Sequence, residues 1–249
     1  MDVIYTIWLR NLKRYIRSKS RMFGSLGMPL FFLIIIGLGL NSSIMVSGYG
    51  QNYIGFIIPG IVAMTVLFTS VFSGIQIIWD KQFGFLKETL VAPVSRIEIM
   101  IGQTVGGATV AVIQGLLILI VSLFISNVVS SAKGFFIAIL FMILIGLAFT
   151  AMGIAFASRM EDMHGFQLIM NFVIFPLFGL SGALFPLSNL PPWLRFATYL
   201  DPLTYGVEGV RYGLLGVSQI NPWACFAVIS GFSVAMLILG GYLFRNVKI

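Results

Sequence analysis

Charged side chains are scarce in this sequence. Asp, Glu, Lys and Arg make up 9% of its 249 residues, and hydrophobic residues make up 59%. A soluble domain carries about 25% charged residues, so the composition excludes an ordinary soluble protein and indicates an integral membrane protein. From Met22 to Trp79 the chain has no Asp, Glu, Lys, Arg or His. That run of 58 residues is too long for one span of about 20 residues and fits two.

Residues that catalyse reactions or bind metals are equally scarce. Cys225 and His164 are the only residues of their types, which excludes an internal disulfide and argues against a thiolate or histidine metal site. His164 falls in a short polar loop, so a Ser–His–Asp arrangement is not credible. No lysine ends a G-x-x-x-x-G-K-[ST] pattern, so the chain has no nucleotide site of that kind. We therefore expect no catalytic, metal-binding or cofactor-binding residue here, and no enzyme activity in this chain.

Long apolar runs predict an all-α integral membrane protein with six transmembrane helices, in a single domain of residues 1–249. The runs are continuous, whereas the strands of a membrane barrel would alternate apolar and polar residues over about ten positions. Short polar stretches separate one run from the next. The predicted spans are 22–40, 54–79, 99–126, 135–157, 166–185 and 223–243.

Basic residues gather on one side of this layout. Of the 15 lysines and arginines, only Lys133, Arg195 and Arg211 fall on the side assigned to the outside. This bias follows the positive-inside rule and predicts that both termini lie in the cytoplasm. A five-span layout would move Arg245 and Lys248 outside and weaken the bias. Topology thus explains the net charge of +7 without a nucleic-acid partner.

The N-terminal segment 1–21 predicts an amphipathic helix in the cytoplasmic interface of the lipid bilayer. Apolar residues share one helical face, and Arg10, Arg14 and Arg17 recur on another. Trp8 is typical of a residue at the level of the lipid headgroups. A secretory signal peptide fits poorly, because no small-residue cleavage site follows the apolar run. The alternative is a juxtamembrane anchor with no further role.

Residues 80–98 form the only long charged segment between two very apolar regions. Phe83, Leu86 and Leu90 fall at i, i+3 and i+7, which is one stripe of a short helix, and Lys87 lies off that stripe. The pattern predicts a short amphipathic helix on the inner face of the membrane. Its stripe either rests on lipid headgroups, as in an ordinary loop, or docks onto another protein.

A break and a new helix follow this segment. Pro93 cannot continue a helix and disfavours helical geometry in the residue before it. Ser95 and Glu98 have the spacing of a capping box, in which each side chain accepts a hydrogen bond from a backbone N–H at a helix start. We expect the third span to begin here. Its small residues Gly102 and Gly106 permit close packing against another helix.

The segment 186–221 is rich in proline and polar residues. Pro192 and Pro202 each begin a stretch typical of a short helix with proline in its first turn. Neither stretch is long or apolar enough to cross a membrane, so we expect short re-entrant or interfacial helices on the outer side. Glu208 and Arg211 are three positions apart and can pair there, either exposed or within a closed exit.

The predicted spans carry essentially no ionisable side chain at mid-depth. A charge there costs about 3 kcal/mol on insertion scales, and proton- or ion-driven carriers accept that cost to build their relays. The absence of such charged side chains argues against a stand-alone channel or secondary carrier. The absence of a His, Asp or Glu cluster at one depth argues against an intramembrane enzyme or assembly factor. Gln103, Gln114 and Asn171 predict hydrogen bonds between helices, or a polar pathway.

Two stretches of the sequence resemble a known family. FGFLKETLVAPVSRIEIMIGQ follows the second span, and SGALFPLSNLPPWLRFATYLDPLTYGVEGVR lies between the fifth and the sixth. Together with the basic amphipathic start and the six spans, they resemble the permease subunits of type-2 ABC exporters. The daunorubicin/multidrug-resistance-like branch is the most similar, and the resemblance covers nearly the whole chain.

The resemblance implies a homodimer or a heterodimer of permeases, with the homodimer favoured, in the plasma membrane of a prokaryote. Two copies of a separate cytoplasmic ABC ATPase would bind this dimer and would hold ATP and Mg, so this chain needs no cofactor. The N-terminal helix with Arg10, Arg14 and Arg17 would be an interface helix beside the ATPase. The segment after the second span would be the coupling helix. Its residues would be Phe83, Gly84, Phe85, Leu86, Lys87, Glu88, Thr89 and Leu90.

The function implied is export of an amphipathic or hydrophobic molecule, drug-like or lipid-like, driven by ATP hydrolysis in the ATPase. A glycolipid, a polysaccharide or an ion is the alternative substrate within the same family. The outer segment would close the exit of the pathway. Its gate residues would be Pro202, Tyr205, Glu208 and Arg211.

Overall fold

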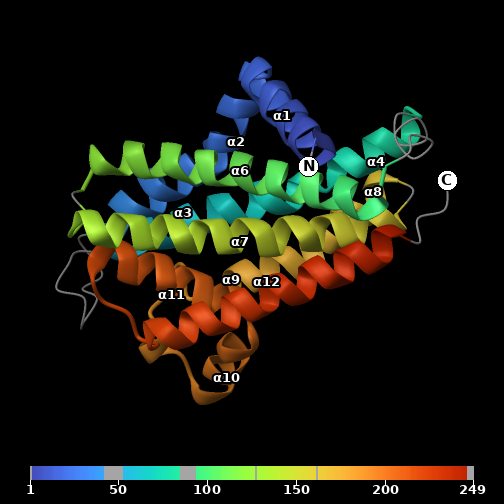
Figure 1. Ribbon diagram of the computed structural model, residues 1–249. Coiled ribbons are helices and arrows are strands. Elements are labelled where there is room, and N and C mark those ends of the chain that lie inside the picture. Colours follow the sequence, from blue (N-terminus) through green and yellow to red (C-terminus); the bar gives the residue numbers. More distant parts are fainter. Residues whose placement is uncertain (1, 42–52, 85–93, 127, 161, 246–249) are drawn as a thin grey trace.

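The computed structural model describes residues 2–41, 53–84, 94–126, 128–160 and 162–245, and all the regular elements of these ranges are helices (Figure 1). This confirms the all-α class expected from the sequence. The elements are α1 (Asp2–Arg17), α2 (Lys19–Phe31), η1 (Phe32–Leu38), α3 (Tyr53–Ser73), α4 (Ile75–Gln82), α6 (Arg96–Leu123), α7 (Ala132–Arg159), α8 (Met163–Ile169), η2 (Met170–Ile174), α9 (Phe175–Leu180), η3 (Leu187–Asn189), α10 (Pro192–Leu200), α11 (Pro202–Leu215) and α12 (Pro222–Arg245).

Five helices of the described chain are long and apolar enough to cross a membrane. A sixth candidate is a bent pair, in which Val3–Arg17 and Met22–Leu38 meet at 72°. Met22–Leu38 falls within the expected first span, and the structure makes its last part a π-helix. The protein is therefore an all-α integral membrane protein. The five long helices are Tyr53–Gln82, Arg96–Leu123, Ala132–Arg159, Met163–Leu180 and Pro222–Arg245.

The bundle has two ends that differ in charge. Lys81, Arg96, Arg159 and Arg245 lie at one end, which we call the basic end. The first residues of α3 and α7 lie at the other, which we call the far end (Figure 1). The basic end is the end that the positive-inside bias assigns to the cytoplasm.

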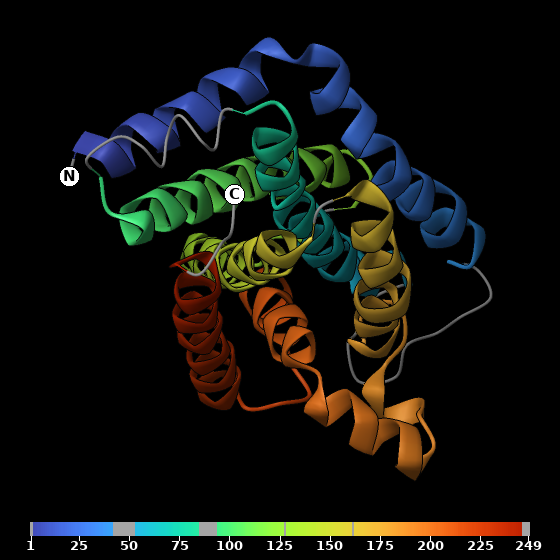
Figure 2. The same ribbon diagram turned by 90° about the vertical axis from the view of Figure 1, so that its right-hand side faces the viewer.

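Helix α3 occupies the centre of the bundle (Figure 2). Its sequence is apolar on all sides, and a helix of that kind is stable when neighbours cover it all round. Helices α6, α7 and α11 pack against it, and every residue from Tyr53 to Leu67 is buried. The remaining helices are thus arranged around α3.

Helix α1 lies across α6 and turns sharply into α2 (Figure 1). Two small residues of α6 make room for it. A Cβ atom added at Gly102 would lie 3.0 Å from the Cβ of Ile7, and one at Gly106 would lie 2.5 Å from Nδ2 of Asn11. The small-residue pattern of the third span therefore packs against the N-terminal helix, and not against another long span.

Helix α11 is re-entrant. It packs on α7, α12 and α3 but is too short to cross the bundle. Gly213 lies against Ala138 in the first turns of α7, and Gly206 lies against Ile145, further along α7. Since α7 begins at the far end, α11 enters the bundle with Pro202 deepest and returns to the far end at its last residue.

Helix α10 differs from α11 because it lies on the side of the bundle (Figure 1). Trp193 and Phe196 are exposed over 72% and 67% of their surfaces. The sequence left re-entrant and interfacial positions open for the two short helices. The structure makes α11 the buried member of the pair and leaves α10 with an uncovered apolar face.

Close packing of α3 on α7 gives a test of the fold. A Cβ atom at Gly153 would lie 2.6 Å from the carbonyl oxygen of Val71, so we expect Gly153→Ala to push the two helices apart and to cost about 1–3 kcal/mol. Gly241→Ala in α12 is the control, because its added methyl meets no atom within 4 Å. Thermal unfolding of the purified protein should show a lower midpoint for Gly153→Ala alone. Equal midpoints for both variants would contradict this packing.

Candidate functional site

Two of the predicted coupling residues lie in the described chain. Phe83 follows α4 directly and is 82% exposed, which is unusual for a large aromatic side chain. Gly84 has a φ of +78°, a left-handed conformation that favours glycine, so the chain turns away from α4 at this point. The other predicted coupling residues lie outside the described residues: Phe85, Leu86, Lys87, Glu88, Thr89 and Leu90.

Helix α6 begins at the capping box that the sequence predicts. The backbone N–H of Ile97 donates to Oγ of Ser95 at 3.3 Å, and the backbone N–H of Ser95 donates to Oε2 of Glu98 at 3.3 Å. The start of α6 is also joined to the end of α12, because Arg96 donates from Nη1 to the carbonyl oxygen of Arg245 at 2.7 Å. The helix that follows the coupling segment thus has a fixed starting point.

An ion pair joins α1 to α4. Nη2 of Arg10 donates to Oδ2 of Asp80 at 2.6 Å, and Nε2 of Gln76 donates to Oδ1 of the same carboxylate at 2.8 Å. Asp80 is 7% exposed, so its carboxylate has little water and depends on these partners. Charge-assisted hydrogen bonds of this length are stronger than neutral ones. The N-terminal helix is therefore held to the helix that leads into Phe83.

A second contact joins α4 to α7. Nζ of Lys81 donates to the carbonyl oxygens of Ser158 at 2.7 Å, Met160 at 3.2 Å and Ala157 at 3.4 Å. Carbonyls at the end of a helix lack partners within the helix and carry partial negative charge, so a lysine ammonium is well placed there. Asp80 and Lys81 thus connect α4 to two other helices at the basic end.

The three arginines predicted for the interface helix occupy different places. Arg10 pairs with Asp80. Arg14 places its guanidinium carbon 5.8 Å from the ring centroid of Trp79, within the range of a cation–π contact. Arg17, in the last turn of α1, is exposed.

Polar residues join α1 and α2 to α6. Nδ2 of Asn11 donates to Oε1 of Gln103 at 2.8 Å, and Nε2 of Gln114 donates to Oγ of Ser25 at 2.6 Å. These bonds confirm that Gln103 and Gln114 link helices, and both residues also line the cavity described next. Asn171 differs, because it is exposed on η2.

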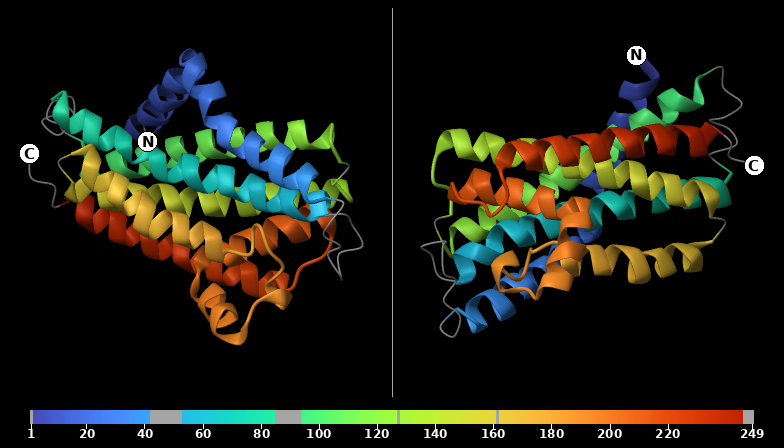
Figure 3. Two further views of the ribbon diagram at one scale, coloured as in Figure 1. Left: turned by 180° about the vertical axis from the view of Figure 1, so that it is seen from behind. Right: turned by 90° about the horizontal axis from the view of Figure 1, so that it is seen from below.

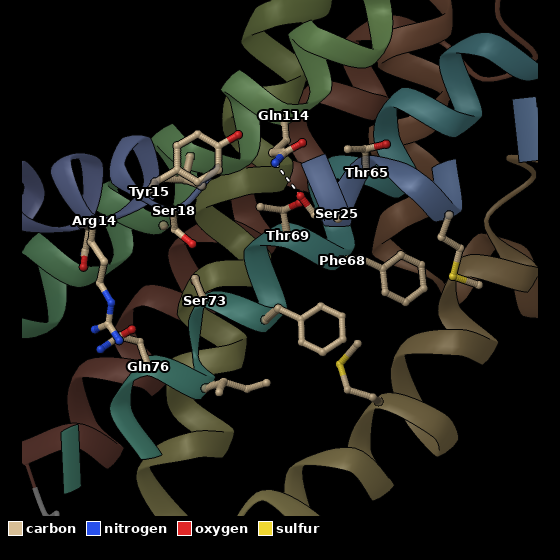
Figure 4. Close-up of a pocket in the computed structure, with 18 of the residues that line it drawn as sticks. Arg14, Tyr15, Ser18, Ser25, Thr65, Phe68, Thr69, Ser73, Gln76 and Gln114 are labelled. Carbon is tan, nitrogen blue, oxygen red and sulfur yellow. Dashed lines mark hydrogen bonds between the residues drawn. The ribbon is translucent and has the colours of Figure 1, made fainter. Parts of the chain in front are cut away.

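A cavity of about 850 Å³ lies between the α1–α2 arm, α3, α4, α6 and the α8–η2 helix (Figure 4). Seen from behind, α2 and η1 run alongside α3 (Figure 3). The volume is typical of a site for a drug-sized molecule. Amide and hydroxyl groups occupy part of the wall, and aromatic and methionine side chains occupy the rest. The wall includes Ser18, Ser25, Thr69, Ser73, Gln76 and Gln114 among the polar residues and Met28, Phe68, Trp79, Met170 and Phe175 among the apolar ones.

Aromatic rings bound the cavity toward the far end. Phe68 and Phe175 line it, with ring centroids 5.1 Å apart. Behind them, Phe178 lies 5.9 Å from Phe68 and packs edge-on against Phe32 at 6.2 Å. Phe178 is one turn beyond Phe175 along α9 and is buried, so the rings form a layer on the far-end side of Phe175. We call these four residues the phenylalanine layer.

A buried ion pair lies within α11, on the part of the helix that returns to the far end. Glu208 and Arg211 are fully buried, and Nη1 of Arg211 donates to Oε1 of Glu208. Nη2 of Arg211 donates to the carbonyl oxygen of Gly182 at 2.8 Å, and its guanidinium lies 4.2 Å from the ring centroid of Phe56. Oε2 of Glu208 accepts the backbone N–H of Gln219 at 2.5 Å. Of the two positions the sequence left open for this pair, the structure selects the enclosed one.

The other two predicted gate residues lie deeper. Pro202 is in the first turn of α11, half-buried, and Asp201 caps this helix by accepting the backbone N–H of Leu203 at 2.9 Å. Tyr205 is half-buried and donates its hydroxyl to the carbonyl oxygen of Tyr199 at 2.8 Å. The structure therefore brings Glu208 and Arg211 together, whereas Pro202 and Tyr205 fix the start of α11 next to α10.

Sequence reasoning missed three residues of this site. The sequence predicts that Asp80 and Lys81 begin the charged segment after the second span, yet they lie in α4 and bind α1 and α7. The available signal was Gln76 four positions before Asp80, a spacing that puts both on one helical face. For Phe56 the sequence holds no such signal, because it is one of 23 phenylalanines. The described residues hold no group of three or more His, Cys, Asp or Glu that could bind a metal ion.

Comparison with known proteins matches residues 2–215 to the family described as ABC-2 type transporter. The inner membrane transport permease YadH of Escherichia coli K12 is 29% identical over 243 residues, which cover 94% of this chain and 91% of that protein. The transport permease ycf38 of Cyanophora paradoxa is 30% identical over 231 residues, covering 88% and 79%. Nodulation protein J of Rhizobium meliloti is 27% identical over 248 residues, covering 93% and 91%.

The buried ion pair gives a test of the far-end closure. Glu208→Gln leaves the guanidinium of Arg211 buried without its carboxylate, and removal of one member of such a pair costs about 3–5 kcal/mol. The double variant Glu208→Gln with Arg211→Met removes both charges and should regain much of that loss. Thermal unfolding in detergent would measure both. If the double variant is no more stable than the single one, the uncompensated charge is not the source of the effect.

Proposed function

Since the chain belongs to the ABC-2 type transporter family and is a multi-pass membrane permease, we propose that it exports an amphipathic or hydrophobic molecule from the cytoplasm. ATP hydrolysis in a separate ABC ATPase subunit drives the transport. The sequence contains no G-x-x-x-x-G-K-[ST] pattern, in keeping with a nucleotide site on a partner. The cavity carries this proposal, because it combines amide and hydroxyl groups with aromatic side chains and ends at the phenylalanine layer.

The proposed direction of transport follows from which end of the bundle is closed. In the proposed orientation the basic end faces the cytoplasm, in agreement with the positive-inside rule. The cavity lies beside the α1–α2 arm, and two barriers separate it from the far end: the phenylalanine layer and the Glu208–Arg211 pair. This arrangement supports loading from the cytoplasmic side and release after both barriers open.

Movement of the ATPase would reach the membrane helices through α4. The exposed Phe83 follows α4 directly and is a suitable anchor for the ATPase. Within α4, Asp80 binds α1 and Lys81 binds α7, so a push on Phe83 would move these helices together. A rigid connection of this kind converts movement of a partner into tilting of the membrane helices.

Two π-helical segments would allow the helices of the cavity wall to bend: η2 contributes Met170 to the wall, and η1 directly continues α2, whose Met28 and Pro29 line it. η1 follows Pro29 in α2, and η2 precedes Pro176 in α9. Proline removes a backbone hydrogen bond, and π-helical turns are frequent at functional sites. Both segments therefore support bending of α2 and of the α8–α9 helix during transport.

The proposed assembly is a homodimer of this permease with two copies of the ATPase, in the plasma membrane of a prokaryote. The ATPase supplies the sites for ATP and Mg. Within the export class, the daunorubicin/multidrug-resistance-like branch remains a prediction from the two motif stretches, and a glycolipid, a polysaccharide or an ion remains the alternative substrate. A stand-alone carrier is disfavoured, because Arg14 is the only charged residue that lines the described cavity.

The proposal predicts that the stripe of Phe83 and Leu86 binds the ATPase. Buried aromatic and apolar anchors of an interface each cost about 2 kcal/mol or more when truncated. We therefore expect Phe83→Ala combined with Leu86→Ala to insert normally but to lose most of the co-purified ATPase and of the transport-coupled ATP hydrolysis.

The matched control is Lys87→Ala, which changes a neighbouring residue off the stripe and should be nearly neutral. Co-purification from membranes measures ATPase retained per permease. An unchanged yield of ATPase with the double variant would mean that the stripe rests on lipid and that this segment is an ordinary loop.

A further inference from the structure

The cavity contains a single charged side chain, Arg14. Its guanidinium stacks beside Trp79 and has no carboxylate partner among the described residues. In Figure 4 it extends along the same side of the cavity as Gln76. An arginine held against an aromatic ring keeps its planar set of N–H donors available to an anion.

A second hollow adjoins the cavity on the side of the α1–α2 arm. It has a volume of about 960 Å³ and lies at the elbow between α1 and α2. Arg14, Ser18 and Ser20 line both hollows, so the two meet at these residues. The second hollow adds four more basic residues and, within the described chain, no acidic one. These residues are Arg10, Lys13, Arg17 and Lys19.

These basic residues are not all equivalent. Arg10 is neutralised by Asp80. Lys13, Arg14, Arg17 and Lys19 have no ion pair with any described carboxylate, and all four are exposed. Arg14 alone combines an unpaired charge with a place in the wall of the cavity. The elbow therefore presents positive charge at the mouth of a space whose interior is apolar and amide-lined.

We propose that the elbow between α1 and α2 binds the anionic head group of an amphipathic molecule, a phosphate ester or a carboxylate, while the apolar part of the molecule occupies the cavity. Arg14 contacts the head group, with Ser18 and Ser20 as neutral donors beside it. The apolar part lies against Met28, Phe68 and Met170. A cation at this position would face several positive charges without a compensating carboxylate.

This inference deepens the proposed function, because it names the class of molecule that the permease takes up. It rests on the proposed function only where the bound molecule is taken to be the exported one. Binding itself requires neither ATP nor the ATPase. An equilibrium measurement on the full chain therefore separates failure of the anion site from failure of ATP-driven export.

The probes are dioctanoyl phosphatidylglycerol, which is anionic, and dioctanoyl phosphatidylcholine, which has the same chains and no net charge. Native mass spectrometry of the detergent-purified full chain gives the affinity for each. We expect phosphatidylglycerol to bind about fivefold more tightly than phosphatidylcholine, which corresponds to about 1 kcal/mol for one partly exposed charged contact. Inorganic phosphate at the same concentration should not displace the lipid, because it has no apolar part. Displacement by phosphate would overturn the amphipathic ligand, and equal affinity for the two lipids would overturn the anion site.

Matched variants separate a specific site from general attraction between basic residues and anionic lipid. Arg14→Gln should abolish the preference for phosphatidylglycerol, whereas Arg14→Lys should keep part of it, since lysine retains the charge but not the planar donors. Arg159→Gln is the control, because Arg159 is exposed at the basic end and lines neither hollow. General attraction gives each basic residue a similar share of the binding energy. If Arg14→Gln and Arg159→Gln lose the preference for phosphatidylglycerol to the same extent, the proposed site is wrong.

Discussion

The enclosed guanidinium of Arg211 is the constraint on which the closed far end of the bundle depends. A charged group inside an apolar bundle is tolerated only where its charge and its N–H groups have partners. For its charge and its two terminal nitrogens, Nη1 and Nη2, Arg211 finds partners on three segments: Glu208 in its own helix, the carbonyl oxygen of Gly182 after α9, and the ring of Phe56 in α3. The re-entrant helix α11 is thus held to the central helix. In the proposed export cycle, opening of the pathway at this end would require that these partners separate together.

At the basic end, charged side chains also have partners on other helices, but these contacts connect helices beside the cavity. Asp80 is buried and satisfied by Arg10 and Gln76, and Lys81 binds the last carbonyls of α7. These bonds do not close a pathway, because the cavity lies next to them. They make one mechanical unit of α1, α4 and α7, whose edge carries the exposed Phe83. In the proposed function, this rigid connection would transmit movement of an ATPase from Phe83 to the membrane helices.

Local features of this fold could be read from the sequence, and long-range pairings could not. The apolar runs predict the long helices because each run extends over a whole helix. Ser95 and Glu98 predict the start of α6, and Pro192 and Pro202 predict the starts of α10 and α11, because each of these signals lies within one turn of the helix start. Arg10 and Asp80 are 70 positions apart, so their contact depends on how α1 crosses α6. The cavity likewise draws residues from α1 to η2, and no single segment of the sequence shows it.

The most direct test of this account asks from which side the cavity can be reached. Thr69 lines the cavity on the basic side of the phenylalanine layer, and Cys225, the only native cysteine, is buried. Thr69→Cys in the permease–ATPase complex can be probed with a membrane-impermeant thiol reagent. Without nucleotide the label should attach only from the cytoplasmic side, and with ATP and vanadate it should attach from the opposite side. Labelling from both sides without nucleotide would contradict the account and indicate an open pore.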